Sequence, residues 1–196
     1  MSFRIEKKLY TKKENLFDFR NFIKSKNFIN QHNERKVKSI YFDNNLLELY
    51  KDSIEGSNPR KKIRIRNYPE HKNNYLLEKK ISSVEGRYKI SKKISDKLCS
   101  DLLLKGIRDK NYGFCKPIIE IIYNREYYKK EDIRVTIDTD IYYKLYNKNI
   151  SKKENQVVVE IKTDYQKDID EIFKEIPVQE IRFSKYCNGI EKLKII

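Results

Sequence analysis

The sequence predicts an α+β fold in which about eight antiparallel strands close into a barrel with a charged lumen, and helices pack outside it. The first observation behind this prediction is a period of two, because short stretches alternate apolar and polar residues as half-buried strands do. The second is that the polar positions carry Lys or Arg together with Glu on several separate stretches. The third is that roughly three or four helical stretches would need to dock on the apolar side. The charged side of the strands is then left to line the lumen.

The composition is that of a folded and very basic chain. Its 196 residues include 44 Lys and Arg against 29 Asp and Glu, a formal net charge of +15. Only 38% of the residues are hydrophobic, but 12% are aromatic, and disordered chains are poor in aromatic residues. We therefore expect residues 1–196 to form a single domain whose partner is an anion.

No part of the sequence indicates a membrane span or a secretory signal, because no apolar run approaches the roughly 20 residues that cross a bilayer. The cysteines Cys99, Cys115 and Cys187 are far apart and form no C-x-x-C pair. A disulfide framework and a zinc ribbon are therefore not indicated. We expect a reducing, cytoplasmic location and no membrane segment in this chain, which leaves a membrane partner open.

Strands are predicted in order along the chain from the alternation of side chains. Residues 62–66 are typical, since the cations Lys62, Arg64 and Arg66 share one face and isoleucines share the other. The predicted strands cover residues 3–9, 37–43, 62–66, 77–81, 87–90, 118–125, 133–138 and 157–162. Turn-forming residues separate them, as in residues 55–59.

Helices are predicted where apolar residues recur at helical spacing. Residues 14–26, 91–105 and 165–176 have this pattern, and residues 184–193 predict a short closing helix. Ser91 is the expected N-cap of the second of these helices.

A backbone loop that cradles phosphates is not predicted, because no two glycines have the spacing of a Walker loop or of a dinucleotide fingerprint. Phosphates would have to be held by side chains, and arginine donates two parallel hydrogen bonds to phosphate oxygens. Arg64 and Arg66 would lie roughly 7 Å apart on one strand face, which suits neighbouring phosphates of a chain. No nucleophile with an adjacent base is indicated, so a covalent intermediate is not favoured.

Glutamates among the cations indicate a second chemical role. A carboxylate beside bound phosphates repels them unless it neutralises a cation or holds a metal ion, and Mg²⁺ and Mn²⁺ commonly bridge carboxylates to phosphates. Glu160, on the same face as Lys162, is the first candidate ligand, and Glu6 and Glu78 follow. The alternative is that each glutamate is only the salt-bridge partner of a neighbouring cation.

Eight of these segments together resemble the vacuolar transporter chaperone (VTC) domain, the polyphosphate polymerase branch of the triphosphate tunnel metalloenzymes. They arrive in the family's order and span nearly the whole chain. The segments are RIEKK at 4–8, SIYFD at 39–43, RKKIRIR at 60–66, LEKK at 77–80, YNREY at 123–127, RVTID at 134–138, VEIK at 159–162 and FSKY at 183–186.

The resemblance implies a tunnel of antiparallel strands and an enzyme that transfers the γ-phosphate of ATP onto a growing inorganic polyphosphate chain. The catalytic, phosphate-binding residues that it implies are Lys8, Arg64, Arg66, Lys80, Arg125, Arg134 and Lys185. The further substrate-binding candidates are Lys162, Arg182, Ser184 and Lys89. It also implies Mn²⁺ or Mg²⁺ as cofactor with Glu160 as a ligand. The first strand departs from the superfamily pattern E-x-E-x-K, since Arg4 stands at its first position and leaves Glu6 as a metal ligand without an acidic companion.

Two alternatives to the polymerase stay open. A triphosphatase could use the same residues to hydrolyse inorganic triphosphate, a nucleotide or an RNA 5′ end. A non-catalytic polyanion or nucleic-acid binder would use the +15 charge and the tyrosines for phosphate contacts and stacking. A nucleic-acid reader would not need glutamate on the same strand faces as its arginines. We therefore expect ATP and inorganic polyphosphate as the partners, and no nucleic acid.

Overall fold

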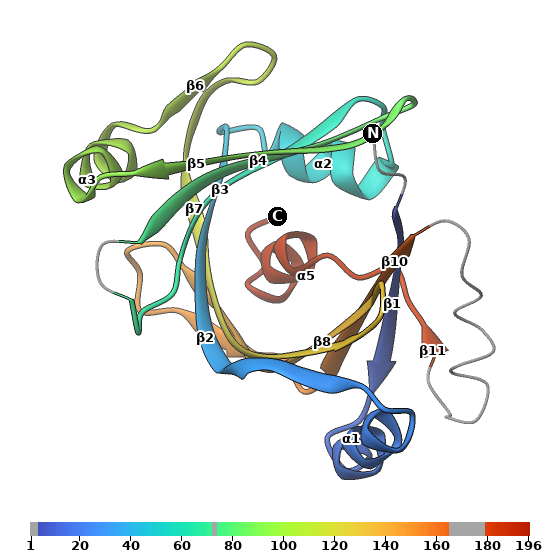
Figure 1. Cartoon of the computed structure of the whole chain (residues 1–196). Helices are drawn as coiled ribbons and strands as arrows, with labels where there is room; N and C mark the ends of the chain where they lie inside the picture. The colour runs from blue at the N-terminus through green and yellow to red at the C-terminus, as the bar shows by residue number, and fades with distance from the viewer. Residues whose placement is uncertain (1–3, 72–73, 165–178) are drawn as a thin grey trace. The chain divides into compact units, whose positions relative to one another are not determined.

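The computed structural model describes residues 4–71, 74–164 and 179–196 (Figure 1). In chain order the elements are β1 (Arg4–Thr11), α1 (Leu16–Ser25), β2 (Ile29–Asp43), α2 (Glu48–Glu55), β3 (Arg60–Asn67), β4 (Tyr75–Ser83), β5 (Gly86–Ile94), α3 (Asp96–Lys105), β6 (Ile107–Asp109), β7 (Gly113–Lys130), β8 (Ile133–Leu145), β9 (Ser151–Lys153), β10 (Val157–Asp164), β11 (Gln179–Glu180) and α5 (Lys185–Lys192). The mixture of strands and four described helices confirms the predicted α+β class.

The strands pair in the order β11-β1-β10-β8-β7-β2-β3-β4-β5, with β6 added on β7 and β9 on β8. The pairings whose register is described are antiparallel, as predicted. The expectation of a closed eight-stranded barrel is corrected, because the sheet has eleven strands and its two end strands, β11 and β5, do not pair in the described part of the chain. The short strand β11 pairs with Leu9 and Tyr10 at the second edge of β1.

The described chain divides into two compact units. The first comprises Met1–Arg35, Tyr123–Ile141 and Lys153–Phe183, and the second comprises Lys36–Ile122, Tyr142–Lys152 and Ser184–Ile196. The long strands β2, β7 and β8 contribute residues to both units. The expectation of a single domain stays a prediction, and the units are described one at a time.

In the first unit, α1 packs on the apolar face of β1, β8 and β10. Phe19 and Ile23 of the helix are buried against a row of aliphatic strand residues, among them Ile137 and Val159. Burying one such side chain contributes about 1.5–3 kcal/mol, so this face holds the helix in place. The charged residues of the same strands lie on the opposite face, as the period of two predicts.

In the second unit, α2 and α3 contribute to an apolar cluster with β2 and β3. Leu49 of α2 and Cys99 of α3 are buried in it with Phe42, Ile63 and other strand residues. The helix α3 starts later than predicted. Strand β5 continues to Ile94, and Ser95 rather than Ser91 caps the helix by accepting a hydrogen bond from the Leu98 amide.

The helix α5 corrects the expectation that all helices pack on the apolar side of the strands. Its Tyr186 ring stacks on Tyr41 of β2, with ring centroids 5.1 Å apart. Ser184, its N-cap, accepts a hydrogen bond of 2.8 Å from Lys62 on the charged face of β3. The amphipathic character of α5 explains this, because the helix presents Tyr186 and Ile190 to an apolar part of the unit and its polar start to the cations.

The sequence did not predict the helix α2, and its start shows why. Leu47 precedes it in a left-handed conformation and offers no side-chain cap. Asp43, at the end of β2, supplies the cap instead by accepting hydrogen bonds from the amides of Leu49 and Tyr50, both at 3.0 Å. The predicted helix over residues 165–176 lies outside the described residues.

Asp43 is therefore expected to be a large contributor to stability. Its buried carboxylate also accepts from the hydroxyl of Tyr186, so Asp43→Ala leaves buried donors of α2 and α5 without their acceptor. We expect the free energy of unfolding to fall by about 2–4 kcal/mol, measured by urea denaturation. The matched control is Asp101→Ala, which removes an exposed carboxylate and should change stability by about 0.5 kcal/mol or less. Equal stability of the two variants would contradict this role for Asp43.

Candidate functional site

In the second unit, the charged face of β3, β4 and β5 places cations directly opposite one another. The strand register aligns Lys62 with Lys80, and Lys80 with Lys89, so that three lysines form one row across three strands. Like charges at directly opposed positions destabilise a sheet. This row therefore favours an anion as the ligand of the face.

Glu78 neutralises part of this charge from the next row. Its carboxylate lies 2.7 Å from the Arg64 guanidinium and 3.8 Å from that of Arg66, and it also pairs with Lys89. Burial by itself would raise the pKa of Glu78, but the charges of Arg64, Arg66 and Lys89 outweigh it and lower the pKa to about 2. Glu78 is thus an ion-pair partner of residues predicted to bind phosphate. This is the second of the two roles considered for the glutamates, in which they pair with cations instead of holding a metal ion.

The start of α5 brings two further predicted residues to the same unit. Ser184 accepts a hydrogen bond from Lys62, and Lys185 is the first residue of the helix. The hydroxyl of Tyr41 accepts a hydrogen bond of 2.8 Å from Arg64, and the Arg64 guanidinium lies 5.7 Å from the Tyr41 ring centroid. The second unit therefore assembles a cationic cluster of Lys62, Arg64, Arg66, Lys80 and Lys89. Ser184 is bonded to this cluster through Lys62, and Lys185 follows Ser184 in the chain.

In the first unit, the charged face of β1, β10 and β8 alternates in sign. The register sets Glu6 opposite Lys162 and Lys8 opposite Glu160. Along each strand, Glu160 lies 2.6 Å from Lys162, and Glu6 lies 3.6 Å from Lys8. Burial would raise the pKa of Glu160, but the neighbouring cations hold it well below its ordinary value. Glu160 is thus held ionised by the cations around it.

Arg125 is fixed by a carboxylate on the neighbouring strand. Its Nε and Nη2 donate to the two oxygens of Asp138 at 2.5 and 2.7 Å, and its guanidinium lies 5.2 Å from the Tyr123 ring centroid. Burial alone would lower the pKa of Arg125, but the charge of Asp138 outweighs burial, and the pKa is raised above its ordinary value. A bidentate pair of this kind orients the guanidinium before any ligand arrives.

Three further predicted residues belong to this unit. Lys8 donates to the carbonyl oxygen of Phe183 at 2.7 Å, which ties β1 to the segment that carries Arg182. The side chain of Arg182 is exposed, while Arg134 is half-buried and aligned with Lys162. The first unit therefore assembles a mixed cluster of Glu6, Lys8, Arg125, Arg134, Asp138, Glu160 and Lys162, and Arg182 lies at an exposed position.

The donors of this mixed cluster suit a hard divalent cation that also binds phosphate. Glu6 and Glu160 occupy adjacent strands on one face, and Mg²⁺ typically takes one or two carboxylates, with water and substrate phosphates as its other ligands. The Thr136 hydroxyl, in register with Glu160, is buried and has no hydrogen-bond partner, so it could meet a metal-bound water or a phosphate oxygen. Within residues 4–71, 74–164 and 179–196 no group of three acidic, His or Cys side chains forms a complete metal cage.

Sequence reasoning had not assigned a role to Tyr41, Thr136 or Asp138. The period of two correctly places Thr136 and Asp138 on the face of Arg134. The period of two does not reveal the pairing between strands, which brings Asp138 to Arg125 and sets Thr136 opposite Glu160.

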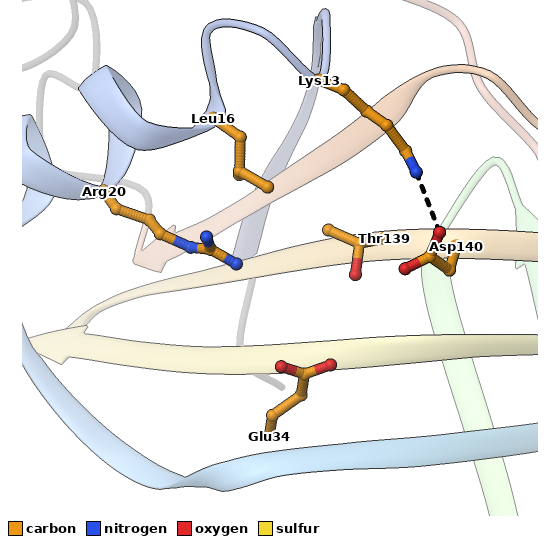
Figure 2. Close-up of a pocket in the computed structure, with 6 residues that line it drawn as sticks. All are labelled: Lys13, Leu16, Arg20, Glu34, Thr139 and Asp140. Atoms are coloured by element: carbon orange, nitrogen blue, oxygen red, sulfur yellow. Dashed lines mark hydrogen bonds and ion pairs between the residues drawn. The ribbon is translucent and has the colours of Figure 1, made fainter.

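The first unit also has a cavity of about 250 Å³ beside α1, which contains no residue of the mixed cluster (Figure 2). Two of its cations are paired, since Lys13 bonds to Asp140 at 2.9 Å and Arg20 bonds to Glu126 at 2.6 Å. The cavity is smaller than typical small-molecule sites. We therefore assign no function to it.

No helix in the described part of the chain is long and apolar enough to cross a membrane.

The chain belongs to the VTC domain family, whose model matches residues 3–194. The sequence matches no curated protein. Among solved structures, a candidate adenylate cyclase of Bacillus halodurans is 15% identical with a TM-score of 0.65, and 97% of each chain is covered. A candidate adenylate cyclase of Vibrio parahaemolyticus is 13% identical with a TM-score of 0.63, over 97% of this chain and 98% of that one. A candidate adenylyl cyclase of Hippeastrum, for which a dominant triphosphatase activity is described, is 14% identical with a TM-score of 0.61, over 97% and 96%.

These findings confirm the family resemblance that the eight segments carry. Identities this low show a shared fold, which is of the triphosphate tunnel type.

The low pKa of Glu78 leads to a prediction for stability in acid. A carboxyl whose folded pKa is about 2, below its ordinary value of 4.5, stabilises the fold fully above pH 4.5 and loses that contribution as the pH falls toward 2. The difference in unfolding free energy between the wild type and Glu78→Gln should therefore shrink by about 3 kcal/mol from pH 5 to pH 2. Urea denaturation at each pH measures it. A difference that does not change with pH would mean that Glu78 is not held ionised by its neighbours.

Proposed function

We propose that this chain is a metal-dependent polyphosphate polymerase that transfers the γ-phosphate of ATP onto a growing inorganic polyphosphate chain. The observation that carries the proposal is the row of Lys62, Lys80 and Lys89, flanked by Arg64 and Arg66 on the same face. Such a repulsive row favours a ligand with many closely spaced negative charges, and a polyphosphate chain has them. The match to the VTC domain supports the same reading.

In the proposed reaction, the bond from the γ-phosphorus to the bridging oxygen of ATP breaks and ADP leaves. A terminal oxygen of the polyphosphate chain forms the new bond to the same phosphorus. Phosphoryl transfer needs mainly positioning and charge stabilisation. In the second unit, Arg64 and Arg66 would neutralise phosphate oxygens, and the ion pair with Glu78 would orient Arg64. In the first unit, Arg125 and Arg134 would neutralise phosphate oxygens, and the ion pair with Asp138 would orient Arg125.

The metal ion would be Mn²⁺ or Mg²⁺, held by Glu160 together with Glu6. When bound, it would supply a positive charge that draws electron density from the transferred phosphoryl group. Lys162 and Lys8, which pair with these glutamates, would bind phosphate oxygens beside the ion.

A triphosphatase is the second candidate, and the description of the Hippeastrum neighbour favours it. In that case water, rather than the chain end, would attack the terminal phosphorus, and the same cations would stabilise the charge.

Three free, buried cysteines support the expected reducing, cytoplasmic location.

The first experiment incubates the purified protein with ATP and Mn²⁺ and resolves the products on a gel stained for polyphosphate. A ladder or smear of chains with release of ADP supports the polymerase. Orthophosphate without chains supports the triphosphatase instead. Tight binding of triphosphate with neither product would indicate a non-catalytic polyanion binder.

Arg64→Ala or Arg66→Ala is expected to abolish turnover and to weaken the binding of inorganic triphosphate by about 2–3 kcal/mol, because each removes a charge-assisted contact. Calorimetric titration measures the binding and the gel assay the turnover. The matched control is Arg108→Ala, which removes an exposed arginine of β6 in the same unit and should change neither. Normal binding in a folded Arg64→Ala variant would exclude this face as the phosphate site.

Glu160→Gln is expected to keep most of the affinity for ATP but to lose the increase in rate with added Mn²⁺, because it removes a charged metal ligand and keeps the size of the side chain. Rates over a Mn²⁺ series test this, with Glu85→Gln, an exposed turn residue, as control. Full activation of Glu160→Gln by Mn²⁺ would show that Glu160 is not the ligand.

A further inference from the structure

The hydroxyl of Tyr41 occupies an unusual position in the second unit. The Tyr41 side chain is buried, its ring stacks on Tyr186, and the Arg64 guanidinium lies 5.7 Å from the ring centroid. Its oxygen accepts a hydrogen bond of 2.8 Å from Nη1 of Arg64. The hydroxyl is therefore fixed beside a residue of the proposed phosphate site.

The proton of this hydroxyl has no acceptor among the described residues. The oxygen accepts from Arg64, and the nearest charged groups that act on it are the cations Arg64, Arg66 and Lys62, none of which can accept a hydrogen bond. A buried phenol normally finds an acceptor for its proton. The acceptor that suits this cationic setting is an anionic oxygen.

We propose that the Tyr41 hydroxyl is a further ligand of the substrate, donating its proton in a hydrogen bond to a phosphate oxygen that Arg64 also binds. The inference rests on the proposed function and adds a residue to its binding site. A phosphate at this position receives an N–H bond from Arg64 and an O–H bond from Tyr41. The phenol then acts as a neutral donor among cations.

The charge state of Tyr41 makes this role dependent on pH. Burial would raise the pKa of Tyr41, but the charges of Arg64, Arg66 and Lys62 outweigh it and lower the pKa to about 8. Above that pH the free protein carries a phenolate, which cannot donate and repels phosphate. Binding must then recover a proton, so the affinity for phosphate falls as the pH rises above 8.

Two titratable neighbours with shifted pKa values, Glu78 and Tyr186, keep their protonation state over this range. On β4, Glu78 stays ionised because its pKa is about 2, and it is paired with cations of β3 and with Lys89 of β5. On α5, burial and Asp43 raise the pKa of Tyr186 above its ordinary value. Between pH 7 and pH 9 the change in this cluster is therefore assigned to Tyr41.

The test compares the wild type with Tyr41→Phe, which keeps the ring and its stacking on Tyr186 and removes only the hydroxyl. The affinity for inorganic tripolyphosphate is measured by calorimetric titration at pH 7 and pH 9. At pH 7 the variant should bind about tenfold more weakly, because one hydrogen bond to a charged group is lost. From pH 7 to pH 9 the wild type should lose about tenfold more affinity than the variant, because the ionisation of the ligand affects both proteins alike.

Tyr88→Phe is the matched control. It lies on β5 next to Lys89, and the alternation of the strand puts it on the opposite face, so it should behave as the wild type at both pH values. Parallel curves for the wild type and Tyr41→Phe, with equal affinity at pH 7, would overturn the inference while leaving the proposed function intact. A wild type that binds no tripolyphosphate would overturn the proposed function, and this inference with it.

A measurement on the wild type alone covers the case in which Tyr41→Phe does not fold. The absorbance of phenolate near 295 nm is followed with and without saturating tripolyphosphate as the pH is raised. One tyrosine should ionise near pH 8 in the free protein and at a higher pH in the complex. A transition that the ligand does not move would overturn the inference.

Discussion

The ion pairs of Glu78 allow one face of β3, β4 and β5 to hold its cations. The side chain is only 3% exposed, and it contacts Arg64, Arg66 and Lys89 from a position in the middle of the three strands. A buried carboxylate is costly without partners, and so is a row of opposed lysines. Each compensates the other in part, and the abundance of cations on this face is the basis of the proposed affinity for anions.

The first unit uses a different arrangement of charge. Its face alternates glutamate and lysine between β1 and β10, and Asp138 engages both donors of Arg125 on one side. These pairs hold the cations in defined orientations before a ligand binds, so less ordering remains to be done on binding. On this face, the buried hydroxyl of Thr136 opposite Glu160 has no hydrogen-bond partner, so it could bond to a ligand.

The helix α5 contacts both the residues that stabilise the second unit and those of its cationic face. Its Tyr186 reaches Asp43, which also caps α2, and its ring stacks on Tyr41, which is bonded to Arg64. The residues that stabilise this unit are thus in contact with the residues that would bind substrate. The Tyr41 ring thus links α5 to Arg64.

The sequence by itself determined the strand faces, because the period of two is a local property. Arg64 with Arg66, and Glu160 with Lys162, could be placed on common faces without any tertiary information, and the eight segments were enough for the family. The tertiary structure decided the register between strands, which sets Lys62 beside Lys80 and Thr136 opposite Glu160. It also decided the open edge at β11, the cap that Asp43 gives to α2, and the place of α5 on the charged face. These depend on contacts between residues far apart in the chain, which no local pattern of spacing records.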